Sequence, residues 1–299
     1  MINIFHRCMV YLSRKWGIWV FYTAVWIVAT GYFLLFPLRV AAGVRFYRAL
    51  FPRRNALYAL WCTWKQFHDF TGIYIDRYIF EFKGDIKYTS EGLQYLRQAV
   101  SEQTGGILLM SHLGNWEAAA RLLKKEGFPL LLFMGQKEGE QIEQTQKVGL
   151  EQNGVQVIAS RQGAGSPLEI LEGVKYLRKG WFLSMAGDRS GEHGSSFAEA
   201  KFLGHRVRVP ETPYVLALAT GAPVFVFFAF RKGPGKYHFV AHPPMEVRAE
   251  SRWLRKKSIA DAAQKYCRLL EQAVYDHPFQ WHHFEPFLGP KTRDKDQSG

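Results

Sequence analysis

The chain has 299 residues, of which 47% are hydrophobic and 22% charged, and this composition excludes a disordered protein. Its three cysteines (Cys8, Cys62 and Cys267) lie far apart and form no CxxC pair, which argues against a disulfide framework or a cysteine zinc site and fits a reducing compartment. The 39 Lys and Arg exceed the 26 Asp and Glu, and the resulting net charge of +13 favours nucleic acid, anionic lipid or an acidic substrate as partner.

The first 68 residues contain nine Lys or Arg and no acidic residue. Residues 1–15 form a basic N-terminal arm, and residues 16–38 form an uncharged apolar run between Lys15 and Arg39. About 20 apolar residues in a helix cross a bilayer, so the run predicts a transmembrane or membrane-embedded helix. A cleaved signal peptide and a buried core helix remain the alternatives. Cations on both sides leave open whether the helix spans the bilayer or lies in one leaflet.

Residues 39–104 follow as a basic, aromatic-rich segment. From Val44 to Phe70, arginines alternate with Phe, Tyr, Leu and Trp in a helical pattern. Such a pattern is typical of an interfacial helix whose cations meet lipid phosphates. No nucleic-acid-binding motif accompanies it, so we expect a membrane partner and no nucleic acid.

Residues 105–289 alternate between short apolar runs and helical stretches. The apolar runs predict strands at 107–111, 130–134, 155–159, 181–186, 223–230 and 237–241. Helices are predicted at 116–126, 138–152, 167–179, 211–220 and 258–275. The pattern indicates an α/β fold, with a central mostly parallel or mixed sheet flanked by helices. Residues 290–299 are expected to form a disordered tail.

The candidate chemistry lies where the first of these strands ends. His112 follows the strand in a loop, and ligands of open α/β sheets bind at the carboxyl ends of strands. A histidine there is a suitable general base near neutral pH. Glu117, placed in the first turn of the next helix, can accept the imidazole N–H and stabilise the imidazolium. Gly114 allows a tight turn and Asn115 can cap the helix, and the alternative is that His112 and Asn115 are only a loop histidine and a cap.

A second polar cluster comprises Asp188, Arg189, Glu192, His193 and His205. Its spacing matches no strong metal template, so we expect no metal and place Asp188 and Arg189 in the same cleft as His112. Arg189 and Arg161 can bind phosphate or a phosphopantetheine donor, although Arg161 can equally form a surface ion pair.

Two further groups flank these clusters. A basic strip can dock an acidic carrier protein or anionic headgroups, or be a solvated face; it comprises Lys201, His205, Arg206 and Arg208. His282 and His283 follow Trp281 and are interpreted as packing or interfacial residues.

Residues His112-Leu-Gly-Asn-Trp-Glu117 resemble the HxxxxE/D motif of the bacterial lipid A biosynthesis (lauroyl/myristoyl) acyltransferase family. Further segments resemble that family in the same order, so the resemblance covers essentially the whole chain. They are Gly187-Asp188-Arg189, Phe202-Leu203-Gly204 with Pro210, Thr220-Gly-Ala-Pro-Val224 and Pro278-Phe-Gln-Trp281.

This resemblance implies an enzyme of the bacterial inner membrane, with its catalytic domain on the cytoplasmic face. The enzyme would transfer a fatty acyl chain from acyl carrier protein or acyl-CoA to a hydroxyl or amine of a lipid or glycolipid, with no cofactor besides the donor. By the same resemblance His112 is the base, Glu117 its partner and Asp188 a further active-site residue. Substrate-binding roles are expected for Asn115, Trp116, Arg161 and Arg189.

The chain departs from the family pattern at two places. Phe133–Lys137 stands where members acting on lipid A commonly have V-Y-R-P, and the 147–149 region lacks an arginine that several members place there. These departures put lipid A itself in doubt as acceptor, but not acyl transfer.

The residues favour direct attack of the acceptor on a thioester. Ser111 lies next to His112 but in no G-x-S-x-G elbow, so no acyl-enzyme is expected. A non-catalytic membrane lipid-binding protein on the same fold and a metal-dependent phosphohydrolase built on residues 188–205 remain the alternatives. The acceptor, the acyl length, the donor carrier and the oligomeric state stay open.

Overall fold

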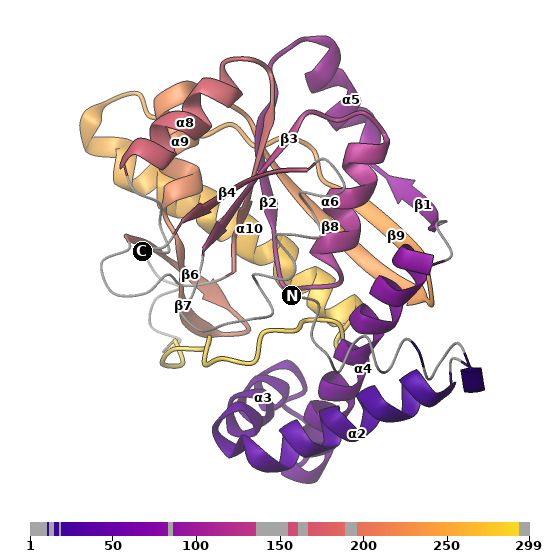
Figure 1. Cartoon of the computed structure of the whole chain (residues 1–299). Helices are drawn as coiled ribbons and strands as arrows, with labels where there is room; N and C mark the ends of the chain where they lie inside the picture. The colour runs from indigo at the N-terminus through magenta and orange to yellow at the C-terminus, as the bar shows by residue number, and fades with distance from the viewer. Residues whose placement is uncertain are drawn as a thin grey trace.

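The computed structural model describes residues 11, 15–17, 19–82, 86–135, 155–160, 167–188 and 196–292. Within these ranges a seven-stranded sheet forms the centre of the molecule (Figure 1). In spatial order its strands are β1 (Lys87–Glu91), β9 (Lys236–Ala241), β8 (Val224–Gly233), β2 (Gly106–Met110), β5 (Phe182–Ala186), β3 (Leu130–Gly135) and β4 (Gln156–Ser160). All neighbours pair in parallel except β8 and β9. The predicted α/β fold with a mostly parallel, mixed sheet is therefore confirmed.

Strand β2 lies in the middle of the sheet and is buried on both faces. Ile107 and Leu109 pack into the core below α9 (Thr212–Thr220) and α10 (Arg255–Asp276), to which α8 (Pro167–Leu177) also contributes. Leu108 and Met110 pack on the opposite face, against α5 (Leu93–Ser101) and α6 (Trp116–Lys125). Burial on both faces explains the uninterrupted apolar run, since each buried aliphatic side chain stabilises the fold by about 1.5–3 kcal/mol.

The six predicted strands and the helices α6, α8, α9 and α10 are confirmed, with ends shifted by a few residues. The sequence interpretation missed β1, α5 and the two-stranded hairpin of β6 (Phe197–Phe202) and β7 (His205–Pro210). The helix predicted at 138–152 lies outside the described residues.

The expectation that residues 39–104 are one interfacial helical segment is wrong for their last part. β1 pairs with β9 in the central sheet, and α5 packs on that sheet. The sequence pattern does not reveal β1, because this edge strand consists mostly of exposed polar residues and contains no apolar run.

The apolar run at 16–38 is not one straight helix. α2 (Trp19–Leu35) has 17 residues and ends before Pro37, where α3 (Pro37–Leu50) begins at 90° to it. Proline breaks the helix because it lacks an N–H and restricts the residue before it. Seventeen helical residues reach about 25 Å, less than the ~30 Å of a bilayer core. Among the described residues no single helix is long and apolar enough to cross a membrane, while the bent pair of α2 and α3 meets that test together.

The helix α4 (Ala56–Phe82) joins this bent pair to the α/β body. In Figure 1, α2 and α3 lie below the sheet, and α4 rises from them toward β9. On one side of α4, Ile75 and Ile79 pack against Phe21 and Val25 of α2. Other residues of α4 face the α/β body, so the three N-terminal helices are packed onto it.

The chain end is ordered somewhat further than expected. The backbone N–H of Thr292 donates to the carbonyl of Gly204 at 2.9 Å, and Lys291 bridges to His205. The rest of the predicted disordered tail, residues 293–299, lies outside the described residues.

A buried carboxylate of α4 holds the β8–β9 hairpin. Asp76 accepts hydrogen bonds from Arg231 Nε at 2.8 Å, from the backbone N–H of Gly235 at 3.0 Å and from the hydroxyl of Tyr237. Tyr237 in turn accepts from Asn115 Nδ2 at 2.8 Å, at the start of α6. Burial and the charge of Asp76 raise the pKa of Tyr237 well above its usual value, so the phenol stays a donor.

We expect Asp76→Ala to lower the free energy of unfolding by about 3–5 kcal/mol, because it leaves Arg231 charged and without its carboxylate. Denaturant unfolding of the purified protein measures this change. Asp261→Ala, on the exposed face of α10, is the matched control and should change stability by less than about 0.5 kcal/mol. Equal stability of the two variants would contradict the structural role of Asp76.

Candidate active site

The neighbouring parallel strands β2 and β5 bring His112 and Asp188 together. Met110 of β2 pairs with Ala186 of β5 in register, and the backbone N–H of Gly187 donates to the carbonyl of Met110 at 2.8 Å. The segments that follow β2 and β5 leave the sheet side by side. His112 and Asp188, 76 residues apart in sequence, therefore lie at the same carboxyl edge of the sheet. Asp188 therefore lies beside His112, as the sequence analysis expected, while Arg189 lies outside the described residues.

The imidazole and the carboxylate form a hydrogen-bonded pair. Nδ1 of His112 lies 2.9 Å from Oδ1 of Asp188, and the backbone N–H of His112 donates to Oδ2 at 2.8 Å. An ionised carboxylate can only accept, so Nδ1 carries a proton, and in the neutral form of the imidazole Nε2 has a free lone pair. The side chain of Asp188 is fully buried, whereas that of His112 is 27% exposed. The pair therefore presents a basic nitrogen to the outside while its carboxylate stays shielded from water.

Asp188 remains charged despite its burial. Burial alone would raise its pKa, but the positive charge of His112 and the hydrogen bonds from His112 and Trp281 outweigh it and hold the pKa well below its ordinary value. Its carboxylate is thus ionised at neutral pH.

Glu117 does not take the place that the sequence interpretation gave it. It is buried in the first turn of α6, where Oε2 accepts from Arg77 Nε at 2.7 Å and Oε1 from Arg121 Nη2 at 2.9 Å. The expected hydrogen bond between Glu117 and the His112 imidazole is therefore replaced by that of Asp188. The physical reason is that a buried carboxylate needs cationic donors, and two arginines supply them. Arg121 was detectable in the sequence as the i+4 neighbour of Glu117, but Arg77, on α4, had no such signal.

The turn between His112 and α6 has the expected construction. Gly114 has a φ of +79°, and a Cβ atom there would lie 2.0 Å from the carbonyl oxygen of Ala229, so only glycine fits. Asn115 is the N-cap of α6, since its side chain accepts from the backbone N–H of Ala118 at 3.1 Å. Its Nδ2 donates to Tyr237, so both ends of its buried amide are occupied within the protein, and a substrate contact would require one of these bonds to open. Trp116 is half-buried against the core around α6 and stays a predicted substrate contact.

The C-terminal segment, residues 277–292, lies against this turn. Gly114 N–H donates to the carbonyl of Gln280 at 2.8 Å, and His282 N–H donates to the carbonyl of His112 at 2.9 Å. Trp281, between them, directs its indole N–H to Oδ2 of Asp188 at 2.8 Å. The sequence marked Pro278–Trp281 as a motif, but its contact with Asp188 is visible only in the fold.

The two histidines that follow Trp281 differ in their surroundings. His282 is buried between Phe70 and Phe284, which confirms its interpretation as a packing residue. The ring of His283 lies 5.9 Å from that of His112, so His283 belongs to the wall of the site. Burial, the largest influence, lowers the pKa of His283, so it is neutral beside the pair.

The remaining predicted residues are only partly placed. Arg161, Arg189, Glu192 and His193 lie outside the described residues. His205 hydrogen-bonds the carbonyl of Gly289 at 3.0 Å through Nδ1, which ties it to the C-terminal segment. In the part of the chain that the structure describes, no three His, Cys, Asp or Glu side chains form a group able to hold a metal ion.

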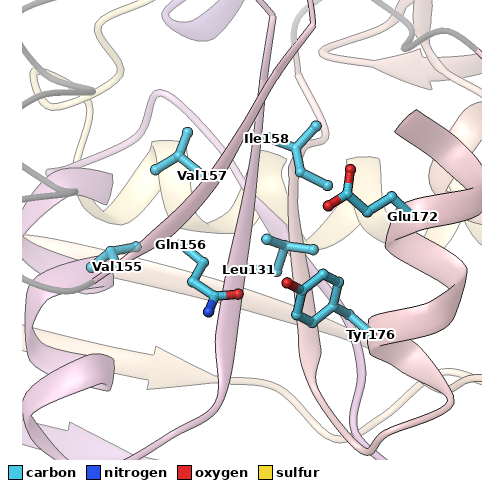
Figure 2. Close-up of a pocket in the computed structure, with 7 residues that line it drawn as sticks. All are labelled: Leu131, Val155, Gln156, Val157, Ile158, Glu172 and Tyr176. Atoms are coloured by element: carbon cyan, nitrogen blue, oxygen red, sulfur yellow. The ribbon is translucent and has the colours of Figure 1, made fainter. Parts of the chain in front are cut away.

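A surface pocket lies apart from His112. Figure 2 shows it at the β4 edge of the sheet, with Gln156 from β4 and Glu172 and Tyr176 from α8 among its lining residues. β5 and β3 separate this edge from β2, so the pocket does not include the histidine–aspartate pair.

Comparison with known proteins adds an independent finding. Residues 79–288 match the family model described as bacterial lipid A biosynthesis acyltransferase. Over 195 residues the chain is also 24% identical to the phosphatidylinositol mannoside acyltransferases of two strains of Mycobacterium tuberculosis. That alignment covers 65% of this chain and 58% of the length of those relatives.

Stability should depend on pH through His282. Burial, with smaller contributions from His112 and Arg231, lowers its pKa from 6.5 to about 3. Between these values the unfolded chain binds the proton and the folded one does not, so stability is lost as the pH falls through this window. We expect His282→Phe to reduce that loss, because phenylalanine cannot titrate and suits the surrounding rings. Unfolding free energies of both proteins at pH 7 and pH 5 measure the effect, and identical changes between the two pH values would exclude it.

Proposed function

Because the chain belongs to the bacterial lipid A biosynthesis acyltransferase family, we propose that it transfers a fatty acyl chain from a thioester donor to a hydroxyl or amine of a lipid or glycolipid. The donor is acyl carrier protein or coenzyme A carrying the acyl chain, and no metal or further cofactor takes part. The observation that carries the proposal is the His112–Asp188 pair at the carboxyl edge of the sheet.

The chemistry follows from the geometry of that pair. Nε2 of His112 takes the proton of the acceptor O–H while the oxygen attacks the thioester carbonyl, and Asp188 stabilises the resulting imidazolium. The tetrahedral intermediate then collapses, the carbon–sulfur bond breaks, and the imidazolium returns the proton to the leaving thiolate. The products are an ester and a free thiol. A positioned base of this kind accelerates a reaction by about 10²–10⁴-fold.

Direct transfer agrees with the surroundings of Ser111. Its side chain is buried, and its hydroxyl accepts the backbone N–H of Leu113 at 3.2 Å. This hydroxyl serves the loop, so we assign the nucleophile to the acceptor itself.

We favour a glycolipid hydroxyl as acceptor. The similar mycobacterial proteins are named for acylating a mannoside of phosphatidylinositol. The chain also lacks the V-Y-R-P stretch common in members that act on lipid A, with Phe133–Lys137 in its place. Arg161 and Arg189 stay the proposed contacts to phosphate or phosphopantetheine groups.

We further propose that α2 and α3 lie in the cytoplasmic leaflet of the bacterial inner membrane. The side of α2 that faces away from α4 exposes Ile27, Val28, Leu34 and Leu35, and Leu38 follows on α3. Exposed cations of α3 and the following turn, Arg48, Arg53 and Arg54, complement lipid phosphates. A bent pair of helices is suited to one leaflet, since neither helix needs to cross the bilayer.

If the donor is acyl carrier protein, we propose that it docks on the basic strip. Lys201 and Arg208 are exposed on the β6–β7 hairpin, which packs against the C-terminal segment next to the site. Glu199 lies opposite Arg208 in the hairpin and reduces the net positive charge of the strip. We therefore expect the contact with the carrier protein to be weak and salt-sensitive.

Purified protein with radiolabelled acyl-CoA or acyl carrier protein and mixed bacterial lipids should yield labelled lipid, identified by mass spectrometry. We expect His112→Ala to abolish transfer and Asp188→Asn to lower kcat by about 10²–10⁴-fold with little change in melting temperature. Glu117→Gln should instead lower the free energy of unfolding by about 3 kcal/mol, because two partly buried arginines lose their shared, buried carboxylate.

Full activity of folded His112→Ala would refute the assigned base. Absence of transfer from either donor by the wild-type protein would favour the non-catalytic lipid-binding alternative. A loss in Asp188→Asn that only follows unfolding would remove Asp188 from the mechanism.

Flotation with vesicles tests the membrane contact. We expect the protein to float with vesicles containing anionic lipid, and Leu34→Ser/Leu35→Ser/Leu38→Ser to reduce the floating fraction at least several-fold, since three lipid-facing side chains are lost. Leu171→Ser/Val215→Ser, exposed on α8 and α9, is the control and should float like the wild type. Equal flotation of both variants would contradict the proposed surface.

A further inference from the structure

We propose that Trp281 is a positioning residue for the transfer reaction: its indole N–H fixes the carboxylate of Asp188, and its backbone connects that bond to helix α4. This inference rests on the proposed function, because it assigns a task in the same site. Nothing in the family match gives Trp281 a role.

The indole N–H helps to fix the plane of the Asp188 carboxylate relative to the imidazole. Oδ2 accepts two N–H groups, one from Trp281 Nε1 and one from the backbone of His112, both at 2.8 Å. Oδ1 is left for Nδ1 of His112 at 2.9 Å. With two donors on one oxygen the carboxylate cannot rotate about its Cβ–Cγ bond without losing both, so the imidazole keeps one tautomer and one orientation.

The indole itself is held from several sides. Trp281 is only 1% exposed, and Phe46 of α3, Phe202 of β6 and Phe287 surround its ring. A phenylalanine would keep an aromatic ring in this apolar environment, and the polar N–H is the part of tryptophan that bonds Asp188. Packing therefore explains an aromatic residue here, and the hydrogen bond explains the indole.

The backbone around Trp281 belongs to the same arrangement. Its carbonyl accepts from Nε2 of Gln66, a buried residue of α4. Its neighbours Gln280 and His282 bond the carbonyl and amide groups of the His112–Gly114 loop, and Leu113 pairs with Trp281 as an antiparallel bridge. The segment that orients Asp188 thus also sets the path of the loop that carries His112.

The same segment contacts the N-terminal helices. The hydroxyl of Tyr47 on α3 donates to the carbonyl of Pro278 at 2.8 Å, and Arg45 Nη2 donates to the carbonyl of Gly289 at 2.7 Å. Trp281 therefore lies where the proposed lipid-binding helices meet the catalytic pair.

Trp281→Phe tests the role of the N–H, since it keeps an aromatic ring and removes the donor. We expect kcat to fall about 10- to 100-fold with the KM for the donor unchanged, because the ring of His112 loses its fixed orientation. We also expect the acid limb of the kcat/KM profile to move to higher pH. The physical reason is that an Asp188 carboxylate with one donor fewer keeps more negative charge, so it stabilises the protonated form of the base more strongly. Trp253→Phe, whose ring is 91% exposed, is the matched control and should leave both quantities unchanged.

A second measurement requires neither enzymatic activity nor a substitution of Trp281. In protein labelled with ¹⁵N-tryptophan, Asp188→Asn should shift the resonance of one buried indole N–H upfield, because its acceptor loses its charge. If no indole resonance changes, the hydrogen bond is absent and the inference is overturned.

The outcomes separate this inference from the proposed function. If the wild type transfers acyl chains, His112→Ala does not, and folded Trp281→Phe matches the wild type in kcat and pH profile, only the positioning role is lost. If activity falls in Trp281→Phe only in proportion to unfolded protein, with the pH profile unchanged, Trp281 is merely structural and the inference is again overturned. If the wild type transfers nothing from either donor, the proposed function fails, and the indole resonance still reports the bond.

Discussion

A buried carboxylate stays ionised only where donors and positive charge replace the water that it has lost. At Asp188 these are the Nδ1–H and backbone N–H of His112 and the indole N–H of Trp281. The β2–β5 pairing brings His112 to the carboxylate, and the C-terminal segment brings Trp281 to it from the other end of the chain. The histidine–aspartate pair therefore depends on three distant parts of the sequence folding together.

The two carboxylates near the start of α6 have different tasks. Glu117 is satisfied by Arg77, which joins α4 to α6, and by Arg121 of α6 itself, whereas Asp188 is satisfied by the two N–H groups of His112 and the indole N–H of Trp281. The positive charges of two arginines offset the negative charge of the carboxylate between them, so it stabilises a nearby imidazolium only weakly. A carboxylate that accepts the N–H of an imidazole directly stabilises the protonated form of that imidazole. The structure thus places Asp188 against His112, as the proposed mechanism requires, and ties Glu117 to Arg77 of α4 and Arg121 of its own helix.

Helix α4 links the exposed apolar surface to the site. Its residues Gln66, Asp76 and Arg77 bond the carbonyl of Trp281, the β8–β9 hairpin and Glu117, respectively. The opposite side of α4 packs against α2, whose outer side chains are apolar and exposed. The N-terminal helices are therefore not a separate anchor on a flexible linker, because α4 packs them onto the α/β body.

The sequence by itself determined those strands, turns and caps that a local pattern of apolar, glycine or capping residues marks. The apolar runs predicted the strands, and Gly114 and Asn115 predicted the turn and the cap after His112, because these features depend on neighbours within a few residues. The tertiary structure decided which carboxylate bonds the imidazole, since Asp188 reaches His112 only through strand order across 76 residues. It also decided that Arg77 holds Glu117, that Trp281 holds Asp188 and that the apolar run bends at Pro37. These outcomes depend on the direction in which packed elements point their side chains, and no local pattern of residues encodes that direction.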